Sequence, residues 1–271
     1  MYQNVRVVLM ETSHSGNIGA VARAMKNMGL ETLYLVSPRA RWDNEEAIGR
    51  SAGSGDVLQN TRVVDSLSEA IGECSFVVGA SARSRRIDWP CITPRVCAAE
   101  VCKRSGKETG EQIALVFGRE DRGLSNEELQ RCHTHVFIPA NPEYTSLNLA
   151  MAVQVLSYEL RMAYLESRQN REDQQGVEQI PGADTISAGA NSITENSWDD
   201  EPATMQETEM FLAHLERTMT AIDYYDPGNP RQLMARIRRL YLRCRLGRME
   251  VNILRGILTA TEKAARNTVQ R

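Results

Sequence analysis

Short apolar runs alternate with segments of helical period through residues 4–165, and this alternation limits the folds open to the chain. The runs are nearly continuous in apolar residues, as expected of strands buried on both faces of a parallel sheet. The periodic segments between them predict helices that cover those faces. We therefore expect an α/β domain with a mostly parallel sheet over residues 1–166. The predicted strands are Val5–Met10, Thr32–Val36, Arg62–Val64, Phe76–Gly79, Ile113–Phe117 and Val136–Ile138.

Two further parts are expected after this domain. Residues 167–205 are polar, small and acidic, with too little apolar surface to offset the entropy of ordering, so we expect a flexible linker. Three amphipathic segments follow and predict a small α-helical domain over residues 206–271. The predicted helices span about 206–222, 229–246 and 249–267, with a Pro- and Gly-containing break between the first two.

Charge is distributed unevenly along the chain. The formal net charge is −3, yet ten Asp and Glu residues and no Lys or Arg lie between Glu172 and Glu209. The rest of the chain therefore carries +7, and the segment from Arg231 to the end carries +9. Clustered positive charge is the electrostatic footprint of a nucleic-acid contact, with a solvated helix face as the alternative explanation.

Several classes of protein are disfavoured by composition. No apolar stretch reaches the roughly 18 to 20 residues of a membrane span, and the N-terminus lacks the pattern of a signal peptide. The six cysteines include no Cys-x-x-Cys pair, so we expect reduced thiols in a cytoplasmic protein without membrane contact. The nearest approach to a metal cluster is Cys132-His133-Thr134-His135, which we interpret as a helix end running into a strand because no second half-site exists.

The first motif with chemical potential follows the strand Val5–Met10. A helix is expected to start near Asn17, which places Asn17, Gly19 and Arg23 within its first two turns. Small residues permit close backbone approach, and a helix N-terminus favours an anion such as phosphate. A dinucleotide-binding fingerprint would need Gly-x-Gly-x-x-Gly, and only Gly16-x-x-Gly19 is present. Arg23 as an ordinary surface residue stays open at this point.

The second motif, Gly118-Arg119-Glu120, follows the strand Ile113–Phe117 directly. Ser125 and Glu128 form a predicted capping box, so residues 118–124 should be an exposed turn before a new helix. Glycine at the strand end would let a ligand press on the backbone. A Gly-x-Glu sequence by itself is common in turns.

The third motif lies near residue 150. Pro139 and Pro142 exclude helix and central strand, so residues 139–145 should be a stiff loop, with Thr145 or Ser146 capping the next helix. That helix reads as too apolar to be exposed. Asn148 in its first turn is expected to be buried and to need a partner for its amide, and an internal hydrogen bond in a core helix would also satisfy it.

Taken together, the three motifs resemble the SPOUT superfamily of S-adenosylmethionine-dependent RNA methyltransferases. Asn17-x-Gly19-x-x-x-Arg23, Phe117-Gly118-x-Glu120-x-x-Gly123-Leu124 and Ser146-Leu147-Asn148-Leu149-Ala150 are similar to its ribose 2′-O-methyltransferase branch. Glu11-Thr12-Ser13-His14, Ser81-Ala82-Arg83-Ser84-Arg85 and the linker with its helical tail resemble the bacterial TrmJ type within that branch. The resemblance is dense over roughly 1–165 and looser over 205–260.

The resemblance implies a sheet whose C-terminal part forms a trefoil knot, an obligate homodimer, and S-adenosylmethionine bound in a bent shape by the knot loops. Such knots break the usual rule of unthreaded connections. The implied substrate is the 2′-hydroxyl of nucleotide 32, a cytidine or uridine, in the tRNA anticodon loop. The implied cofactor-binding residues are Ala80, Ser81, Ala82, Gly118, Ile138, Thr145, Ser146 and Leu147.

The same resemblance gives the reacting groups. A ribose hydroxyl is a poor nucleophile, so the site must position it and stabilise negative charge as its proton leaves. Arginine is a reluctant base, so Arg23 is expected to hold phosphate and the developing alkoxide, while Asn17, Glu120, Ser146 and Asn148 orient Arg23 and the ribose. No metal is required. RNA phosphates are expected to contact Arg83, Arg85, Arg86, Arg236, Arg238, Arg239 and Arg243.

Three other functions stay open on the sequence alone. A 2′-O-methyltransferase acting on ribosomal RNA or another tRNA position would share every catalytic motif. A non-catalytic RNA-binding relative is possible, although such loss of function usually erodes the polar site, and that site is complete here. A nucleotide-dependent oxidoreductase is the most distant alternative.

Overall fold

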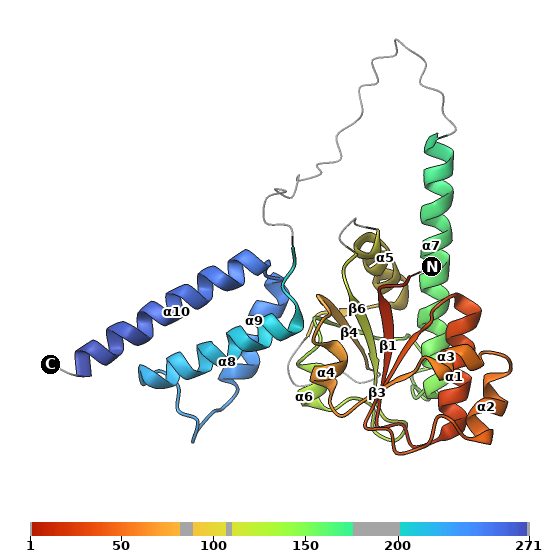
Figure 1. Cartoon of the computed structure of the whole chain (residues 1–271), viewed down its shortest axis with the longest axis horizontal. Helices are drawn as coiled ribbons and strands as arrows, with labels where there is room; N and C mark the ends of the chain where they lie inside the picture. Colours follow the sequence, from red (N-terminus) through yellow and green to blue (C-terminus); the bar gives the residue numbers. More distant parts are fainter. Residues whose placement is uncertain (1, 82–88, 107–109, 176–200, 270–271) are drawn as a thin grey trace, which may run out of the picture.

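The computed structural model describes residues 2–81, 89–106, 110–175 and 201–269. Figure 1 shows an α/β domain and a helical domain that extends away from it. The described part of the α/β domain holds one sheet of seven strands in the order β3-β2-β1-β6-β4-β7-β5, and every pair is parallel. The expected α/β architecture is therefore confirmed. The strands are β1 Val5–Met10, β2 Thr32–Val36, β3 Arg62–Val64, β4 Phe76–Ala80, β5 Cys91–Ile92, β6 Ile113–Phe117 and β7 Thr134–Val136.

The sheet is buried because alternate side chains of each strand enter two separate clusters. Val7 and Leu9 of β1 lie in one cluster, and Val8 and Met10 lie in the other. Helices on both faces complete these clusters (Figure 1). One face carries α1 Ser15–Met28, α2 Glu45–Ser51, α3 Gly55–Gln59, α5 Pro94–Ser105 and α7 Leu149–Gln175, and the other carries α4 Leu67–Ile71 and α6 Asn126–Leu129.

Gly19 explains how α1 and α2 pack so closely. A Cβ at this position would lie 2.1 Å from the Ala47 carbonyl oxygen, so no larger residue fits without moving α2. The small residue was expected to let a phosphate approach the helix. That expectation is wrong for Gly19, because the backbone of α2 occupies the space beside it.

Three boundaries differ from the sequence prediction. The last predicted strand begins and ends two residues earlier, at Thr134–Val136, and the two-residue strand β5 was not predicted. Helix α7 continues to Gln175, although a linker was expected from residue 167. Residues 167–175 contain Glu, Gln and Arg, whose unbranched side chains propagate a helix that tertiary packing has already nucleated.

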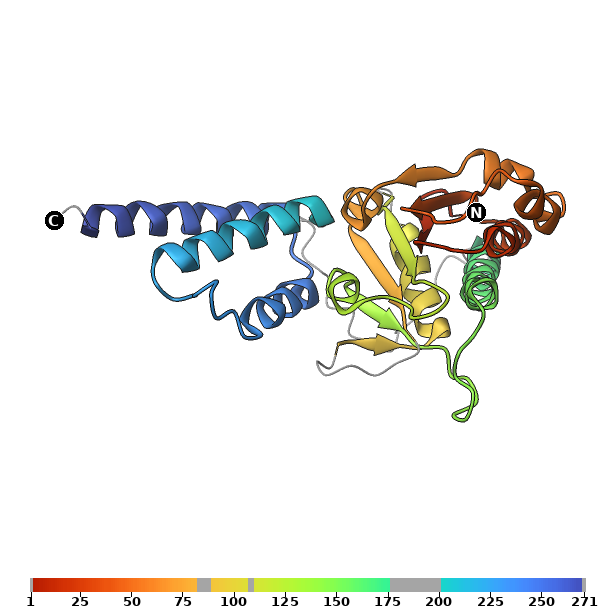
Figure 2. The ribbon, with the colours of Figure 1, turned by 90° about the horizontal axis from the view of Figure 1, so that it is seen from below.

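The helical domain contains α8 Met205–Ala221, α9 Leu233–Cys244 and α10 Arg248–Val269, close to the three predicted helices. Phe211, Leu212 and Val251 form its core, and Figure 2 shows α8 lying along α10. Helix α9 starts later than expected, because Arg231 adopts a left-handed conformation (φ 46°) directly after Pro230.

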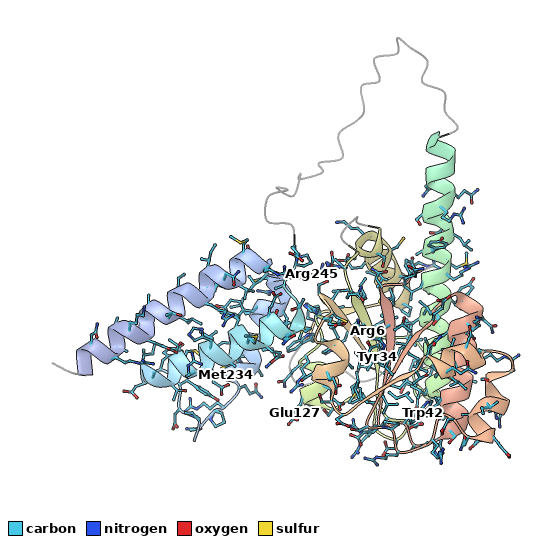
Figure 3. All side chains as sticks on the ribbon, in the orientation of Figure 1. Arg6, Tyr34, Trp42, Glu127, Met234 and Arg245 are labelled. Atoms are coloured by element: carbon cyan, nitrogen blue, oxygen red, sulfur yellow. The ribbon has the colours of Figure 1, made fainter. Side chains whose placement is uncertain are left out.

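The helical domain docks at the amino ends of the strands. The Met205 amide donates to Cys74 O at 2.9 Å, and its side chain joins the second cluster of the sheet. Arg245 bonds Glu100 at 2.6 Å, and its guanidinium lies 5.2 Å from the centre of the Phe76 ring (Figure 3). Within the described ranges, no helix is long and apolar enough to cross a membrane.

Candidate active site

Three loops that are distant in sequence meet at the carboxyl edge of the sheet, and Asn17 joins them. The Asn17 amide nitrogen donates to Glu120 Oε1 at 3.0 Å, after β6. Its carbonyl oxygen accepts from the Asn148 amide at 3.1 Å, just before α7. The three sequence motifs therefore form one site, as predicted.

Glu120 is held as a carboxylate. Partial burial opposes its ionisation, but hydrogen bonds from the Asn17 amide and from the Ser13 backbone and hydroxyl outweigh it and lower the pKa of Glu120. An ionised carboxylate can only accept hydrogen bonds, so it fixes which end of the Asn17 amide faces it. The Asn17 oxygen is thereby turned toward Asn148.

Asn148 is exposed, whereas the sequence predicted a buried residue. Its Oδ1 accepts the Ala150 N–H at 2.9 Å, so Asn148 caps α7, and the expected caps Thr145 and Ser146 precede the helix. Because the Asn148 oxygen bonds the helix, its nitrogen faces Asn17. Two interactions therefore lock this amide in one orientation.

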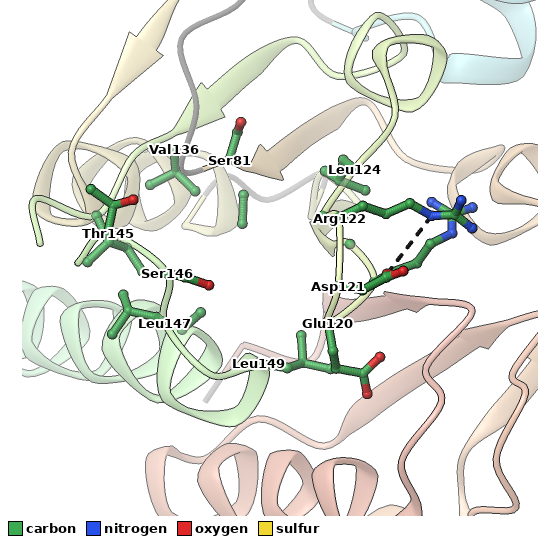
Figure 4. A pocket seen from close by; sticks show the side chains of 16 residues that line it. Ser81, Glu120, Asp121, Arg122, Leu124, Val136, Thr145, Ser146, Leu147 and Leu149 are labelled. Carbon is green, nitrogen blue, oxygen red and sulfur yellow. Dashed lines mark ion pairs between the residues drawn. The ribbon is translucent and has the colours of Figure 1, made fainter. Parts of the chain in front are cut away.

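A cavity of about 200 Å³ opens beside this cluster. Figure 4 shows the Ser146 hydroxyl pointing into it, with Leu147 and Thr145 on one side and Leu124 on the other. The expected cofactor-binding residues that line it are Ala80, Ser81, Gly118, Ile138, Thr145, Ser146 and Leu147, while Ala82 lies outside the described residues. Glu120 lines the same cavity, so the polar cluster and the pocket share a wall.

Residues 118–124 form a closed turn at the cavity wall. Arg119 and Gly123 exchange two backbone hydrogen bonds, of 3.3 and 2.9 Å. A Cβ at Gly118 would lie 2.0 Å from the Gly123 carbonyl carbon. The closure of its own loop therefore requires glycine at position 118, which also lines the cavity. The predicted capping box of Ser125 and Glu128 is confirmed immediately afterwards.

Arg23 lies apart from the cluster. It is exposed on α1, does not line the cavity, and makes no hydrogen bond or ion pair within the described part of the chain. The structure of one chain therefore brings together Asn17, Glu120 and Asn148, places Ser146 in the cavity, and leaves Arg23 outside the cavity lining.

The predicted RNA-binding residues divide into three groups. Arg83, Arg85 and Arg86 lie outside the described residues. Arg236 and Arg243 are exposed on α9, and Arg239 is half-buried. Arg238 forms an ion pair with Glu209 of α8, so its guanidinium already has a partner.

The Cys132-His133-Thr134-His135 segment is part of the core. His133 Nδ1 accepts the Val77 N–H at 3.0 Å. Burial, with Arg245 and Arg104 nearby, lowers the pKa of His133 to about 3, so the ring is neutral. His135 stacks on Trp89. Among the described residues, no group of His, Cys, Asp and Glu side chains could hold a metal ion.

Sequence reasoning missed Glu11 and Arg119. Arg119, which lines the cavity, bonds both Glu11 and Glu128. The available signal was a charged residue near the end of each of two buried strands. Glu11 follows β1 directly, and Arg119 follows β6 after Gly118. Charges at such positions cost desolvation and usually have partners.

Comparison with known proteins extends over both domains. Residues 4–158 match the SpoU rRNA Methylase family, and residues 206–270 match the C-terminal domain of the tRNA methyltransferase TrmJ. The chain is 50% identical over 266 residues to the Pseudomonas aeruginosa tRNA (cytidine/uridine/adenosine-2′-O-)-methyltransferase TrmJ, covering 98% of this chain and 96% of that protein. It is 47% identical over 264 residues to the Yersinia pestis tRNA (cytidine/uridine-2′-O-)-methyltransferase TrmJ, covering 97% and 93%.

Solved structures agree with these matches. The crystal structure of TrmJ from Z. mobilis ZM4 aligns with a TM-score of 0.74 and 29% identity, covering 95% of this chain and 98% of that one. A probable methylase family protein from Haemophilus influenzae aligns with a TM-score of 0.59 and 43% identity, covering 99% and 100%.

Proposed function

Because the chain belongs to the SpoU rRNA methylase family and carries a TrmJ C-terminal domain, we propose that it methylates the ribose 2′-hydroxyl of nucleotide 32, a cytidine or uridine, in the tRNA anticodon loop. The similarity to tRNA 2′-O-methyltransferases over both domains supports a tRNA substrate. The hydrogen-bonded cluster of Asn17, Glu120 and Asn148 at a cavity is the observation that carries the catalytic part of the proposal. A cytoplasmic location would follow from a tRNA substrate.

The methyl donor would be S-adenosylmethionine, which supplies a methyl group on a positively charged sulfur when bound. The cavity fits such a molecule in character: Ile138 and Leu147 give apolar walls, and the turn at Gly118 gives backbone hydrogen-bonding groups. Residues Ala80, Ser81 and Thr145 would hold the remaining polar atoms. The trefoil knot implied by the family stays a prediction.

The chain's own residues would orient the acceptor ribose. Asn17 and Asn148 are fixed amides at the cavity edge, and Ser146 places a hydroxyl inside it. Bound S-adenosylmethionine would supply the methyl group to the ribose oxygen and leave as the neutral thioether, and the hydroxyl proton would pass to phosphate or water. The polar groups act by stabilising charge on the ribose oxygen in a partly enclosed site.

In a homodimer, Arg23 of one copy would contribute to the active site of the other copy. Helix α7 exposes Met151, Tyr158 and Leu165, which are 61, 49 and 42% exposed and follow one another at intervals of seven residues. Such a spacing places them on one face of a helix, where another helix can cover them. Helix α1 packs beside α7 and carries Arg23, so a homodimer formed on this face would bring Arg23 toward the partner.

RNA binding would use both domains. Arg236 and Arg243 are exposed on α9, and Arg83, Arg85 and Arg86, which lie outside the described residues, would add phosphate contacts. The helical domain docks at the amino ends of the strands, and the cavity lies at the carboxyl ends. A bound RNA must therefore extend along the molecule.

The decisive experiment is transfer of a labelled methyl group from S-adenosylmethionine to bulk tRNA, followed by mapping of the modified nucleotide. Label at the ribose of nucleotide 32 is expected. If label is found only in ribosomal RNA, or at another tRNA position, the proposed substrate is wrong and the proposed 2′-O-methyl transfer stands. No transfer to any RNA, together with a thermal shift by NAD and none by S-adenosylmethionine, would overturn the proposal.

A further inference from the structure

Arg119 is a charged residue that lines the cavity and is almost buried. Its side chain is 11% exposed and lies between two carboxylates from different elements. It donates to Glu128 of α6 at 3.0 and 2.9 Å, in a two-pronged arrangement, and to Glu11 at the end of β1. The guanidinium thus ties the turn after β6 to two neighbours.

Glu11 pairs with Arg119 from a strained backbone conformation. It adopts a left-handed conformation (φ 42°), which a residue with a Cβ rarely takes. The hydrogen bond from Arg119, with a further one from Arg39, lowers the pKa of Glu11 to about 2. Glu11 is therefore a carboxylate at neutral pH.

The next residue along the chain, Glu120, points the other way. Its carboxylate reaches Ser13 and Asn17, and Ser13 lies two residues after Glu11. Two carboxylates therefore connect the turns after β1 and β6. Glu11 follows β1 and bonds Arg119, and Glu120 follows β6 and bonds Ser13 and Asn17.

Arg119 also closes the turn that lines the cavity. Its backbone exchanges both hydrogen bonds with Gly123, so the position of its side chain sets the position of residues 118–124. Moving this turn would displace Glu120 from Asn17, since Glu120 directly follows Arg119 in the chain.

We propose that Arg119, held by Glu11 and Glu128, is a positioning residue that keeps Glu120 against Asn17 and keeps the cavity turn in its shape. Its guanidinium is already paired with Glu11 and Glu128, and it acts through Glu120. The inference rests on the proposed function, because a displaced Glu120 would be observed as slower methyl transfer. Lysine cannot replace it, because one ammonium group cannot form the two-pronged bond to Glu128 and also reach Glu11.

The test compares Arg119→Lys, Glu120→Gln and the double variant in the full-length protein, using labelled methyl transfer to tRNA. Arg119→Lys should lower kcat at least about ten-fold, since misplacing a catalytic group commonly costs that much or more. The double variant should be no more than about two-fold slower than Glu120→Gln, because residues that act as a unit are not additive. Two effects that multiply would overturn the proposal, as would unchanged activity of Arg119→Lys.

Hydrogen exchange gives a readout that does not depend on activity. Amides of residues 118–124 should exchange faster in Arg119→Lys, while the rest of the sheet keeps its protection. Arg41→Lys is the matched control, because Arg41 forms a two-pronged pair with Asp43 at 3.0 and 2.9 Å on the exposed surface. If Arg119→Lys does not fold, Glu11→Gln tests the same network, and normal exchange with normal kcat in that variant would also overturn the proposal. A wild-type protein that methylates no RNA would sink the proposed function, and the exchange result would still decide the role of Arg119.

Discussion

The amide nitrogen of Asn17 lies 3.0 Å from Glu120 Oε1, which joins two residues 103 positions apart across the carboxyl edge of the sheet. This contact sets the orientation of the whole cluster. Glu120 can only accept, so Asn17 must present its nitrogen to Glu120 and its oxygen to Asn148. One carboxylate therefore fixes two amides in turn.

Asn17→Asp should disrupt the hydrogen bonds that orient Asn17 between Glu120 and Asn148. The variant keeps the shape of the side chain but removes the donor and places a second negative charge beside Glu120, which should raise the pKa of Glu120. We expect kcat to fall by about 100-fold or more, in the range found when a preorganised polar group is lost. Steady-state methyl transfer to tRNA measures this. Asn126→Asp, an exposed position at the start of α6, adds the same charge and should leave kcat within about two-fold.

Arg23→Ala should abolish methyl transfer while the fold is retained, because Arg23 is exposed and makes no hydrogen bond or ion pair within the described part of its own chain. Loss of a group that stabilises the developing charge should cost about 100-fold or more in kcat. Lys26→Ala removes a positive charge one turn further along the exposed side of α1 and should have little effect. Near-normal turnover of Arg23→Ala would remove Arg23 from the mechanism.

Much of this site could be predicted because the strands around it are buried on both faces. Apolar runs such as Val5–Met10 and Ile113–Phe117 end where burial ends, so their bounds and the loops after them were predicted from the sequence. Strand β5 has only two residues, Cys91 and Ile92, and no period can be recognised in so short a run.

Other features depend on partners that are distant in sequence. Arg238 resembles its arginine neighbours on α9, and only the fold places Glu209 beside it. Asn148 was predicted to be buried because the helix after it is apolar, yet that helix leaves Met151 and Tyr158 exposed. The hydrophobic pattern predicts that a helix face packs against other apolar residues. It does not predict whether those residues belong to the same chain.

Stability should respond to acid through Glu11. The folded pKa of about 2 lies below the ordinary value of 4.5, so the carboxylate stabilises the fold above pH 4.5, and this contribution is lost as the pH falls from 4.5 toward 2. Wild type should therefore melt at a higher temperature than Glu11→Gln near neutral pH, and the difference should shrink below pH 4.5. Thermal unfolding followed at several pH values measures it. A difference that is constant from pH 7 to pH 2 would contradict the prediction.

Placing a charge on the exposed face of α7 should separate the proposed dimer. Tyr158→Glu would bury a carboxylate at the centre of the Met151, Tyr158 and Leu165 stripe, and an unpaired buried charge is costly. Sedimentation velocity should show a dimer for wild type and a monomer for the variant. Ile48→Glu, at a position 55% exposed on α2, is the control and should stay dimeric. A monomeric wild type would refute the dimer, and with it the role of Arg23 in trans.

Removing positive charge from α9 should weaken tRNA binding without affecting the chemistry. Arg236 and Arg243 are exposed and available for phosphates, whereas Arg238 is paired with Glu209. Each lost phosphate contact should reduce the slope of log affinity against log salt by about 0.7 to 0.9. The double variant Arg236→Gln/Arg243→Gln should therefore bind tRNA more weakly and with a shallower salt dependence, measured by filter binding over a salt series. At saturating tRNA the kcat of the double variant should match wild type. Helix α9 belongs to the domain docked at the amino ends of the strands, whereas the cavity lies at their carboxyl ends. Lys26→Gln, which removes one positive charge from α1, is compared with each single variant Arg236→Gln and Arg243→Gln as a control. An unchanged salt slope in the double variant would show that the positive charge of α9 serves the fold and not the RNA.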